Sequence, residues 1–114
     1  MLVRAKEAYQ LWHGHLVHVK RMDRFTIGER IDGAFLEFLE LVFRASFAAD
    51  KFEKLSHISA AIAKCDIVKF LLQIAWEGKV INSKIYGALI LNLDEVGRML
   101  GGWKRTVKNK TPAR

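Results

Sequence analysis

Apolar residues recur at three- and four-residue steps along almost the whole chain, which is the spacing of α-helices. Pro112 is the only proline and stands near the C-terminus, so nothing breaks long helices before it. Short connections between such helices favour an all-α, antiparallel four-helix bundle, formed by a single domain over residues 1–114. The four apolar stripes are Ala5, Tyr9, Trp12, Leu16 and Val19; Ile27, Ile31, Ala34, Phe38, Leu41 and Ala45; Leu55, Ile58, Ile62, Cys65, Leu72 and Trp76; and Ile85, Leu89, Leu93, Val96, Leu100, Trp103 and Val107.

Polar stretches predict where the first three helices end or begin. The stretch Lys20–Arg24 ends the first periodicity, and Thr26 with Glu29 three residues later has the spacing of a capping box. The second helix is therefore expected to begin at Thr26. The pattern resets at residues 49–51, where the third helix is expected to start.

The connection after the third helix carries its own signals. Gly78 is predicted to be the C-cap of the third helix, and Asn82 or Ser83 the N-cap of the fourth.

The second helix has a broader apolar surface than a small bundle needs. A further stripe of Phe35, Leu39 and Val42 runs beside the main one, and Phe43 and Phe47 widen it. A surface helix normally shows one apolar face. This pattern predicts burial on more than one side, as a homo-oligomer would provide.

Three glycines, Gly97, Gly101 and Gly102, stand close together in the second half of the fourth helix, and each costs about 1 kcal/mol relative to alanine inside a helix. Gly97 and Gly101 are four residues apart and share one face, which predicts the close approach of another backbone. The alternative is that the glycines end the helix near Gly102.

The whole chain has a formal net charge of +7, and the excess positive charge is concentrated at its two ends. Residues 1–24 carry five basic and two acidic side chains, residues 25–97 eight and ten, and residues 98–114 six and none. A basic surface attracts polyanions such as nucleic acid, although a solvated tail would look the same. The candidate phosphate ligands after Trp103 are Lys104, Arg105, Lys108 and Lys110.

Residues typical of catalysis or metal binding are sparse. The chain has no Walker loop, no G-x-S-x-G and no H-E-x-x-H, and no arginine precedes a histidine by five to seven residues as in small helical ribonucleases. His15 and His18 can converge on a helix while His13 points away, so a metal site would need a third ligand from another helix, such as His57 or a carboxylate, which the pattern does not indicate. The single cysteine, Cys65, is expected to be a buried hydrophobe. We therefore expect no enzyme, no metal and no cofactor.

No apolar run reaches the roughly 20 residues of a membrane span, and the N-terminus lacks the apolar region of a signal peptide. These features predict a cytoplasmic protein that does not cross a membrane.

Four segments carry a resemblance to a known family. "AYQLW" (8–12), "RFTIGERID" (24–32), "CDIVKFLLQIA" (65–75) and "LDEVGRMLGGWKR" (93–105) resemble, in order and spacing, the accessory variability determinants of diversity-generating retroelements. The similarity covers nearly the whole chain, and "GRMLGGW" is its most specific part.

The resemblance implies a positively charged homopentamer of four-helix bundles, without catalytic activity, that binds the retroelement reverse transcriptase and RNA or DNA. Arg98 falls in the family's G-R-x-L-G segment, and Lys69 falls where the family tends to carry a basic residue on the third helix. Gln73 stands where a second basic residue often follows. Related proteins belong to intervening sequences of 23S ribosomal RNA genes, so a structural or RNA-associated role is the alternative function. The gene neighbourhood would distinguish the two.

Overall fold

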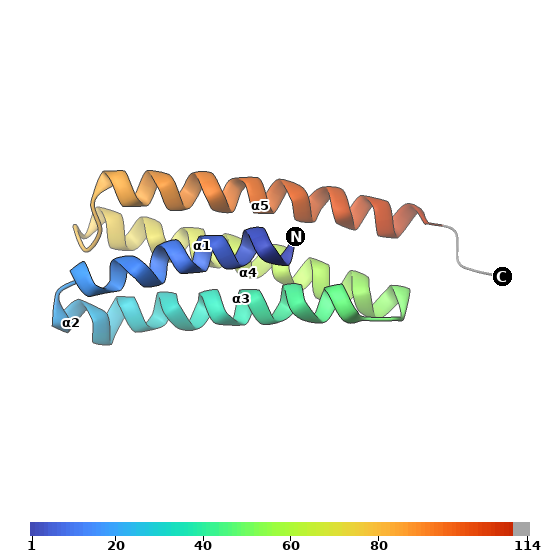
Figure 1. Cartoon of the computed structure of the whole chain (residues 1–114), viewed down its shortest axis with the longest axis horizontal. Coiled ribbons are helices and arrows are strands. Elements are labelled where there is room, and N and C mark those ends of the chain that lie inside the picture. Colours follow the sequence, from blue (N-terminus) through green and yellow to red (C-terminus); the bar gives the residue numbers. More distant parts are fainter. Residues whose placement is uncertain (111–114) are drawn as a thin grey trace.

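The computed structural model describes residues 1–110; Pro112 and Arg114 lie outside this range. Four long helical segments run side by side, and short connections make consecutive segments antiparallel (Figure 1). The predicted all-α four-helix bundle is confirmed. The segments are α1 (Leu2–His15) with the 3₁₀ turn η1 (Leu16–His18); α2 (Arg21–Asp23), the π-helix η2 (Arg24–Gly28) and α3 (Glu29–Phe47), which form one continuous helix; α4 (Lys51–Glu77); and α5 (Ser83–Asn109).

Most of the core is built from the predicted apolar stripes, and its largest fully buried side chains include Trp12, Phe35 and Phe38. Trp76, which was predicted in the third stripe, is instead 38% exposed, and its Nε1 donates a hydrogen bond to Ser83 Oγ at 3.0 Å. One carboxylate also ties α1 to α3. Asp32 Oδ1 accepts hydrogen bonds from the Tyr9 hydroxyl at 2.9 Å and from Trp12 Nε1 at 3.2 Å. The first helix is therefore fixed by both apolar packing and polar contacts.

The second helical segment begins at Arg21, so the predicted start at Thr26 is wrong. The backbone is extended at Val19 and Lys20, and this is where the chain turns between the first two helices. Thr26 already lies inside the helix, and its hydroxyl donates to the carbonyl oxygen of Met22 at 3.0 Å. Because the preceding residues are helical, the threonine bonds backwards along the helix instead of capping it.

The π-helix η2 ends at a glycine. Gly28 is buried, and a Cβ atom added to it would lie 3.0 Å from the carbonyl oxygen of Asp23. Such a contact is tighter than ordinary van der Waals packing. A larger residue at this position would force the backbone of η2 to shift.

Side chains at the other connections agree well with the sequence pattern. Asn82 caps α5 as predicted, because its Oδ1 accepts a hydrogen bond from the N–H of Ile85 at 2.9 Å. Gly78 is the C-cap of α4, although the residue with positive φ is Lys79. Asp50 caps α4 in the same way as Asn82 caps α5.

The helices differ in length, and this divides the molecule into two ends. At 1.5 Å per residue, α1 is about 21 Å long, whereas α4 and α5 are each about 40 Å long. The N-terminus of α1 lies near the middle of the bundle (Figure 1), where Arg4 forms an ion pair with Glu95. Beyond this point α3, α4 and α5 continue alone, around a small second core of Ala45, Ile58 and Val107. We call residues 43–62 and 97–110 the three-helix end.

Across residues 1–110, no helix is both long enough and apolar enough to span a lipid bilayer.

Candidate functional site

Three of the six predicted site residues meet in one groove. Lys69 of α4 and Arg98 and Arg105 of α5 line an open depression of about 550 Å³ between these two helices. The sequence could not show this directly, because the residues come from helices that run in opposite directions. The full lining of this α4–α5 groove is Ile62, Cys65, Asp66, Lys69, Asp94, Gly97, Arg98, Gly101 and Arg105.

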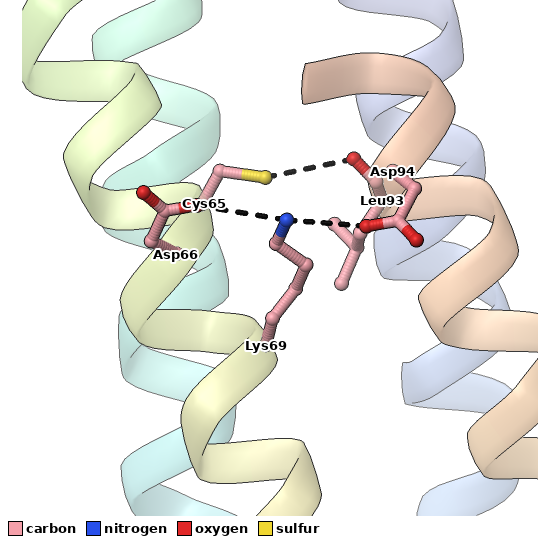
Figure 2. Close-up of polar contacts among 5 residues, drawn as sticks. All are labelled: Cys65, Asp66, Lys69, Leu93 and Asp94. Atoms are coloured by element: carbon pink, nitrogen blue, oxygen red, sulfur yellow. Dashed lines mark hydrogen bonds and ion pairs between the residues drawn. The ribbon is translucent and has the colours of Figure 1, made fainter. Parts of the chain in front are cut away.

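Lys69 is held between two carboxylates. Its Nζ lies 3.1 Å from Oδ1 of Asp94 and 3.5 Å from Oδ1 of Asp66 (Figure 2). Burial alone would lower the pKa of the Lys69 ammonium. The hydrogen bond to Asp94 and the nearby Cys65 and Asp66 outweigh burial and raise this pKa. Lys69 therefore stays protonated, with much of its charge balanced inside the groove.

Cys65 forms part of the groove floor. The residue is 1% exposed, and its Sγ donates to the carbonyl oxygen of Leu93 at 3.7 Å (Figure 2). Burial raises the pKa of the thiol to about 11, so it remains protonated at neutral pH. The prediction that Cys65 is a buried hydrophobe is confirmed.

The glycine face of α5 forms a wall of the same groove. A Cβ atom on Gly97 would meet nothing within 4 Å, and the nearest atom to one on Gly101 is Nη1 of Arg105 at 3.9 Å. Within the described chain, the predicted close approach of a second backbone is therefore wrong. The alternative is also wrong, because α5 continues to Asn109. The glycines instead leave the groove open and give the Arg105 guanidinium room to lie over α5.

The cations of the groove differ in how far they are compensated. Arg98 and Arg105 are exposed, and neither has a carboxylate within 4.0 Å among residues 1–110. Lys69, in contrast, is paired twice. The two arginines are consequently the groove cations available to an anionic partner.

The remaining predicted cations lie at the three-helix end. Lys108 and Lys110 are exposed and Lys104 is half-buried. Two lysines from the start of α4 join them. Lys51 Nζ donates to the carbonyl oxygen of Lys110 at 2.9 Å, and Lys54 Nζ lies 5.4 Å from the ring centroid of Trp103. We call Lys51, Lys54, Lys104, Arg105, Lys108 and Lys110 the terminal cation cluster.

Lys51 and Lys54 were not among the residues predicted from the sequence. The sequence could have indicated them, because two antiparallel helices of equal length place the start of α4 beside the end of α5. Lys54 also has a structural role. Its Nζ donates to the carbonyl oxygen of Ala45 at 2.8 Å and so closes the end of α3.

The histidines behave as their helical spacing predicts. The rings of His15 and His18 are 5.5 Å apart, whereas His13 packs against Tyr9. Burial, followed by the charge of His18, lowers the pKa of His15. Within residues 1–110, no three His, Cys, Asp or Glu side chains are grouped closely enough to hold a metal ion.

Two patches of large exposed apolar side chains lie on α3 and α4. On α3, Phe43 and Phe47 are 51% and 72% exposed, and their ring centroids are 4.9 Å apart. On α4, Ile67, Phe70 and Ile74 are exposed at three- and four-residue spacing, so they share one face. This face of α4 is opposite its core stripe, which means that α4 also has two apolar sides. We call these five residues the apolar surface.

The fold and the candidate site together define a class of protein. The chain is a four-helix bundle, and cations gather in its α4–α5 groove and at its three-helix end. Within that class, residues 3–107 match the family model described as bAvd-like. The chain belongs to this family, whose name denotes bacterial accessory variability determinants. A search of curated proteins finds no significant match.

Proposed function

We propose that this protein is a noncatalytic accessory subunit that binds nucleic acid, forms a homo-oligomer and associates with a retroelement reverse transcriptase. The terminal cation cluster is the observation that carries nucleic-acid binding. It brings six cations from two helices to one end, and in residues 1–110 none of them has a carboxylate within 4.0 Å. Phosphates are the natural counter-ions of such a surface.

The cluster favours binding without strong sequence preference. Lysine and arginine side chains at a helix end can reach phosphate oxygens, but base-specific contacts need side chains placed in a groove of the nucleic acid. The described residues show cations on flexible stems, fixed by few hydrogen bonds. These cations would therefore contribute to the affinity for nucleic acid and to its position on the protein, but little to the recognition of a base sequence.

The apolar surface supports self-association. Contiguous exposed apolar side chains on a small protein are typical of interaction sites. Phe43 and Phe47 lie near the end of α3, whereas Ile67, Phe70 and Ile74 lie on the outer face of α4. Because the two patches lie on different helices, the α3 patch of one copy can contact the α4 patch of the next copy. Repeated contacts of this kind form a closed ring when the rotation from one copy to the next divides a full turn evenly. A ring of five is the assembly proposed.

Membership of the bAvd-like family supports association with a reverse transcriptase. The α4–α5 groove is the surface proposed for this contact, because Arg98 and Arg105 lie beside a glycine face that leaves room for a partner. Co-expression with a retroelement reverse transcriptase, taken from the gene neighbourhood if one is encoded there, followed by size-exclusion chromatography, tests the proposal. The two proteins should elute together.

A pair of matched variants sharpens this test. Arg98→Glu reverses a charge in the groove, and Arg30→Glu makes the same change at an exposed residue of α3. Only Arg98→Glu should reduce co-elution, while both variants keep the helical content of the wild type. RNA binding by wild-type protein without co-elution would contradict the polymerase partner and favour the ribosomal-RNA-associated alternative.

A further inference from the structure

The end of the molecule opposite the terminal cation cluster also exposes cations, next to large apolar side chains. The turn from η1 into α2 and η2 carries Lys20, Arg21 and Arg24, which are all exposed, together with Met22 and Phe25, which are 79% and 66% exposed. Figure 1 shows α2 at the end of the bundle far from the C-terminal end of α5. We call these five residues the corner patch.

The charge of the corner patch is not compensated. Asp23 is the only carboxylate among residues 20–25, against three cations. Within residues 1–110, no acidic oxygen lies within 4.0 Å of Lys20, Arg21 or Arg24. The patch therefore presents a net positive surface to solvent, separate from the cations of α5.

The aromatic ring of the patch is held beside a guanidinium group. The Cζ atom of Arg21 lies 5.9 Å from the ring centroid of Phe25, which is within the range of a cation–π contact. The backbone beneath is the π-helix η2, which ends at the buried Gly28, where an added Cβ atom would lie 3.0 Å from the carbonyl oxygen of Asp23. π-Helical turns are rare and occur frequently at functional sites.

We propose that the corner patch binds single-stranded nucleic acid, with an unpaired base stacked on Phe25 and the neighbouring phosphates contacted by Arg21, Arg24 and Lys20. Proteins that bind single strands combine cations along the backbone with exposed aromatic rings on which bases stack. This is a second site, beyond the phosphate-binding surface proposed above, and it differs in requiring unpaired bases. The two sites would engage opposite ends of a molecule 56 Å long.

A single strand fits this patch better than an anionic membrane does. A helix that lies in a membrane interface needs an apolar face along its length. Here only Met22 and Phe25 are large exposed apolar side chains between residues 20 and 28. The next exposed residues, Thr26 and Glu29, are polar, so no apolar face continues along the helix. The apolar area is small, and the position of the guanidinium beside the ring suits a base and its phosphate.

The test compares a labelled 20-nucleotide oligothymidylate with a 20-base-pair duplex, each titrated with the intact protein. Phe25→Leu keeps an apolar side chain but removes the aromatic face, so it should weaken single-strand binding by about tenfold and leave duplex binding unchanged. Phe25→Trp should bind the single strand at least as well as the wild type. Val3→Ala, at an apolar residue of α1 that is 65% exposed and lies outside the apolar surface, the groove and the corner patch, is the control and should match the wild type.

Ultraviolet cross-linking gives an independent readout. After irradiation of the oligothymidylate complex and digestion with trypsin, the modified peptide should be the one from Phe25 to Arg30. Anionic vesicles of phosphatidylglycerol and phosphatidylcholine are tested in parallel. Binding to vesicles that depends on Phe25, with no such dependence for the oligothymidylate, would overturn the proposal.

The outcomes separate this inference from the proposed function. If the wild type binds neither nucleic acid, both fail. If it binds them but Phe25→Leu and an Arg21→Ala/Arg24→Ala variant bind as the wild type does, only the corner patch is refuted. If Phe25→Leu lowers single-strand and duplex affinity equally, base stacking is also refuted.

Discussion

The ammonium nitrogen of Lys69 lies 3.1 Å from Oδ1 of Asp94, and this contact joins α4 to α5 across the groove. A residue that the sequence suggests as a ligand for phosphate is thus already engaged by a carboxylate of the same chain. Beside it, Arg98 and Arg105 have no carboxylate within 4.0 Å in the described part of the chain, residues 1–110. An anionic partner would meet these arginines first and would have to displace Asp94 to reach Lys69.

The Lys69–Asp94 pair should contribute modestly to stability. The two side chains are 29% and 44% exposed, so solvent screens the pair and a coupling energy of about 0.5–1 kcal/mol is expected. Urea unfolding of Lys69→Met, Asp94→Asn and the double variant measures this coupling. Because the pKa of Lys69 is raised on folding, its contribution is complete below the unfolded pKa of about 10.4 and is lost as the pH rises through the folded pKa. A coupling of zero at pH 7 would contradict the prediction.

Tyr9 should make the fold sensitive to alkaline pH. Burial, followed by the hydrogen bond to Asp32, raises the pKa of Tyr9 to about 12 from its ordinary value of 10.0. Between these values the unfolded chain loses the phenolic proton and the folded chain keeps it, so stability falls as the pH rises. Tyr9→Phe should reduce this slope, at a cost of about 1.5 kcal/mol at neutral pH because the hydrogen bond to Asp32 is removed. Chemical unfolding at pH 8, 10 and 11 tests it, and equal slopes for both proteins would refute it.

Two glycines should respond to alanine in opposite directions. A Cβ atom on Gly97 meets nothing within 4 Å, so Gly97→Ala should stabilise the protein by about 1 kcal/mol through helix propensity. Gly28→Ala should destabilise it, because the new Cβ would press on the backbone of Asp23. Thermal and urea unfolding compare the two variants. If Gly97→Ala gains stability but no longer elutes with the reverse transcriptase, a partner occupies the glycine face.

The apolar surface should hold the oligomer together. Light scattering should give a mass near five times that of the 13.1 kDa chain. Phe47→Glu or Phe70→Glu should lower that mass or make the protein insoluble, because a charge would be buried in the contact. Leu91→Glu is the control, since Leu91 is 70% exposed on α5 outside the apolar surface. A wild-type monomer at micromolar concentration would contradict the assembly.

The terminal cation cluster should set the salt dependence of nucleic-acid binding. Replacing Lys104, Arg105, Lys108 and Lys110 with alanine should weaken binding to unrelated duplexes about equally. It should also flatten the log–log salt slope by roughly 0.9 for each phosphate that is no longer neutralised. A variant with Lys6, Arg30, Lys64 and Lys84 replaced carries the same change in charge at other positions and serves as the control. Equal affinities and slopes for the two variants would assign the C-terminal cations to solubility alone.

Much of the fold could be predicted from local patterns, because helical periodicity and caps act over a few residues. The apolar stripes identify the core, and Asn82 is recognisable as a cap. The start of the second helix is harder to place, because the break depends on the extended backbone at Val19 and Lys20. Their side chains carry no turn signal. The π-helix is equally invisible in the sequence, since the single glycine at its end, Gly28, is not a signal specific to a π-helix.

The site was harder to predict, because its residues meet only in three dimensions. Net charge by segment locates the C-terminal cations, but it does not reveal that Lys69 is paired with Asp94 or that Lys51 and Lys54 join the end of α5. The apolar face of α4 also escapes sequence reasoning. Its two opposite stripes overlap along the sequence and resemble one continuous run.

The short first helix has a consequence for how the molecule opens. Since α1 begins near Arg4 and Glu95, the three-helix end is held by a small core of Ala45, Ile58 and Val107 and by the contacts of Lys51 and Lys54. Backbone amides there will exchange with solvent deuterium through partial openings that cost less free energy than global unfolding. A ligand that joins α4 to α5 at this end suppresses those openings, so occupancy of the terminal cations can be followed as protection of amides in the last three turns of α5.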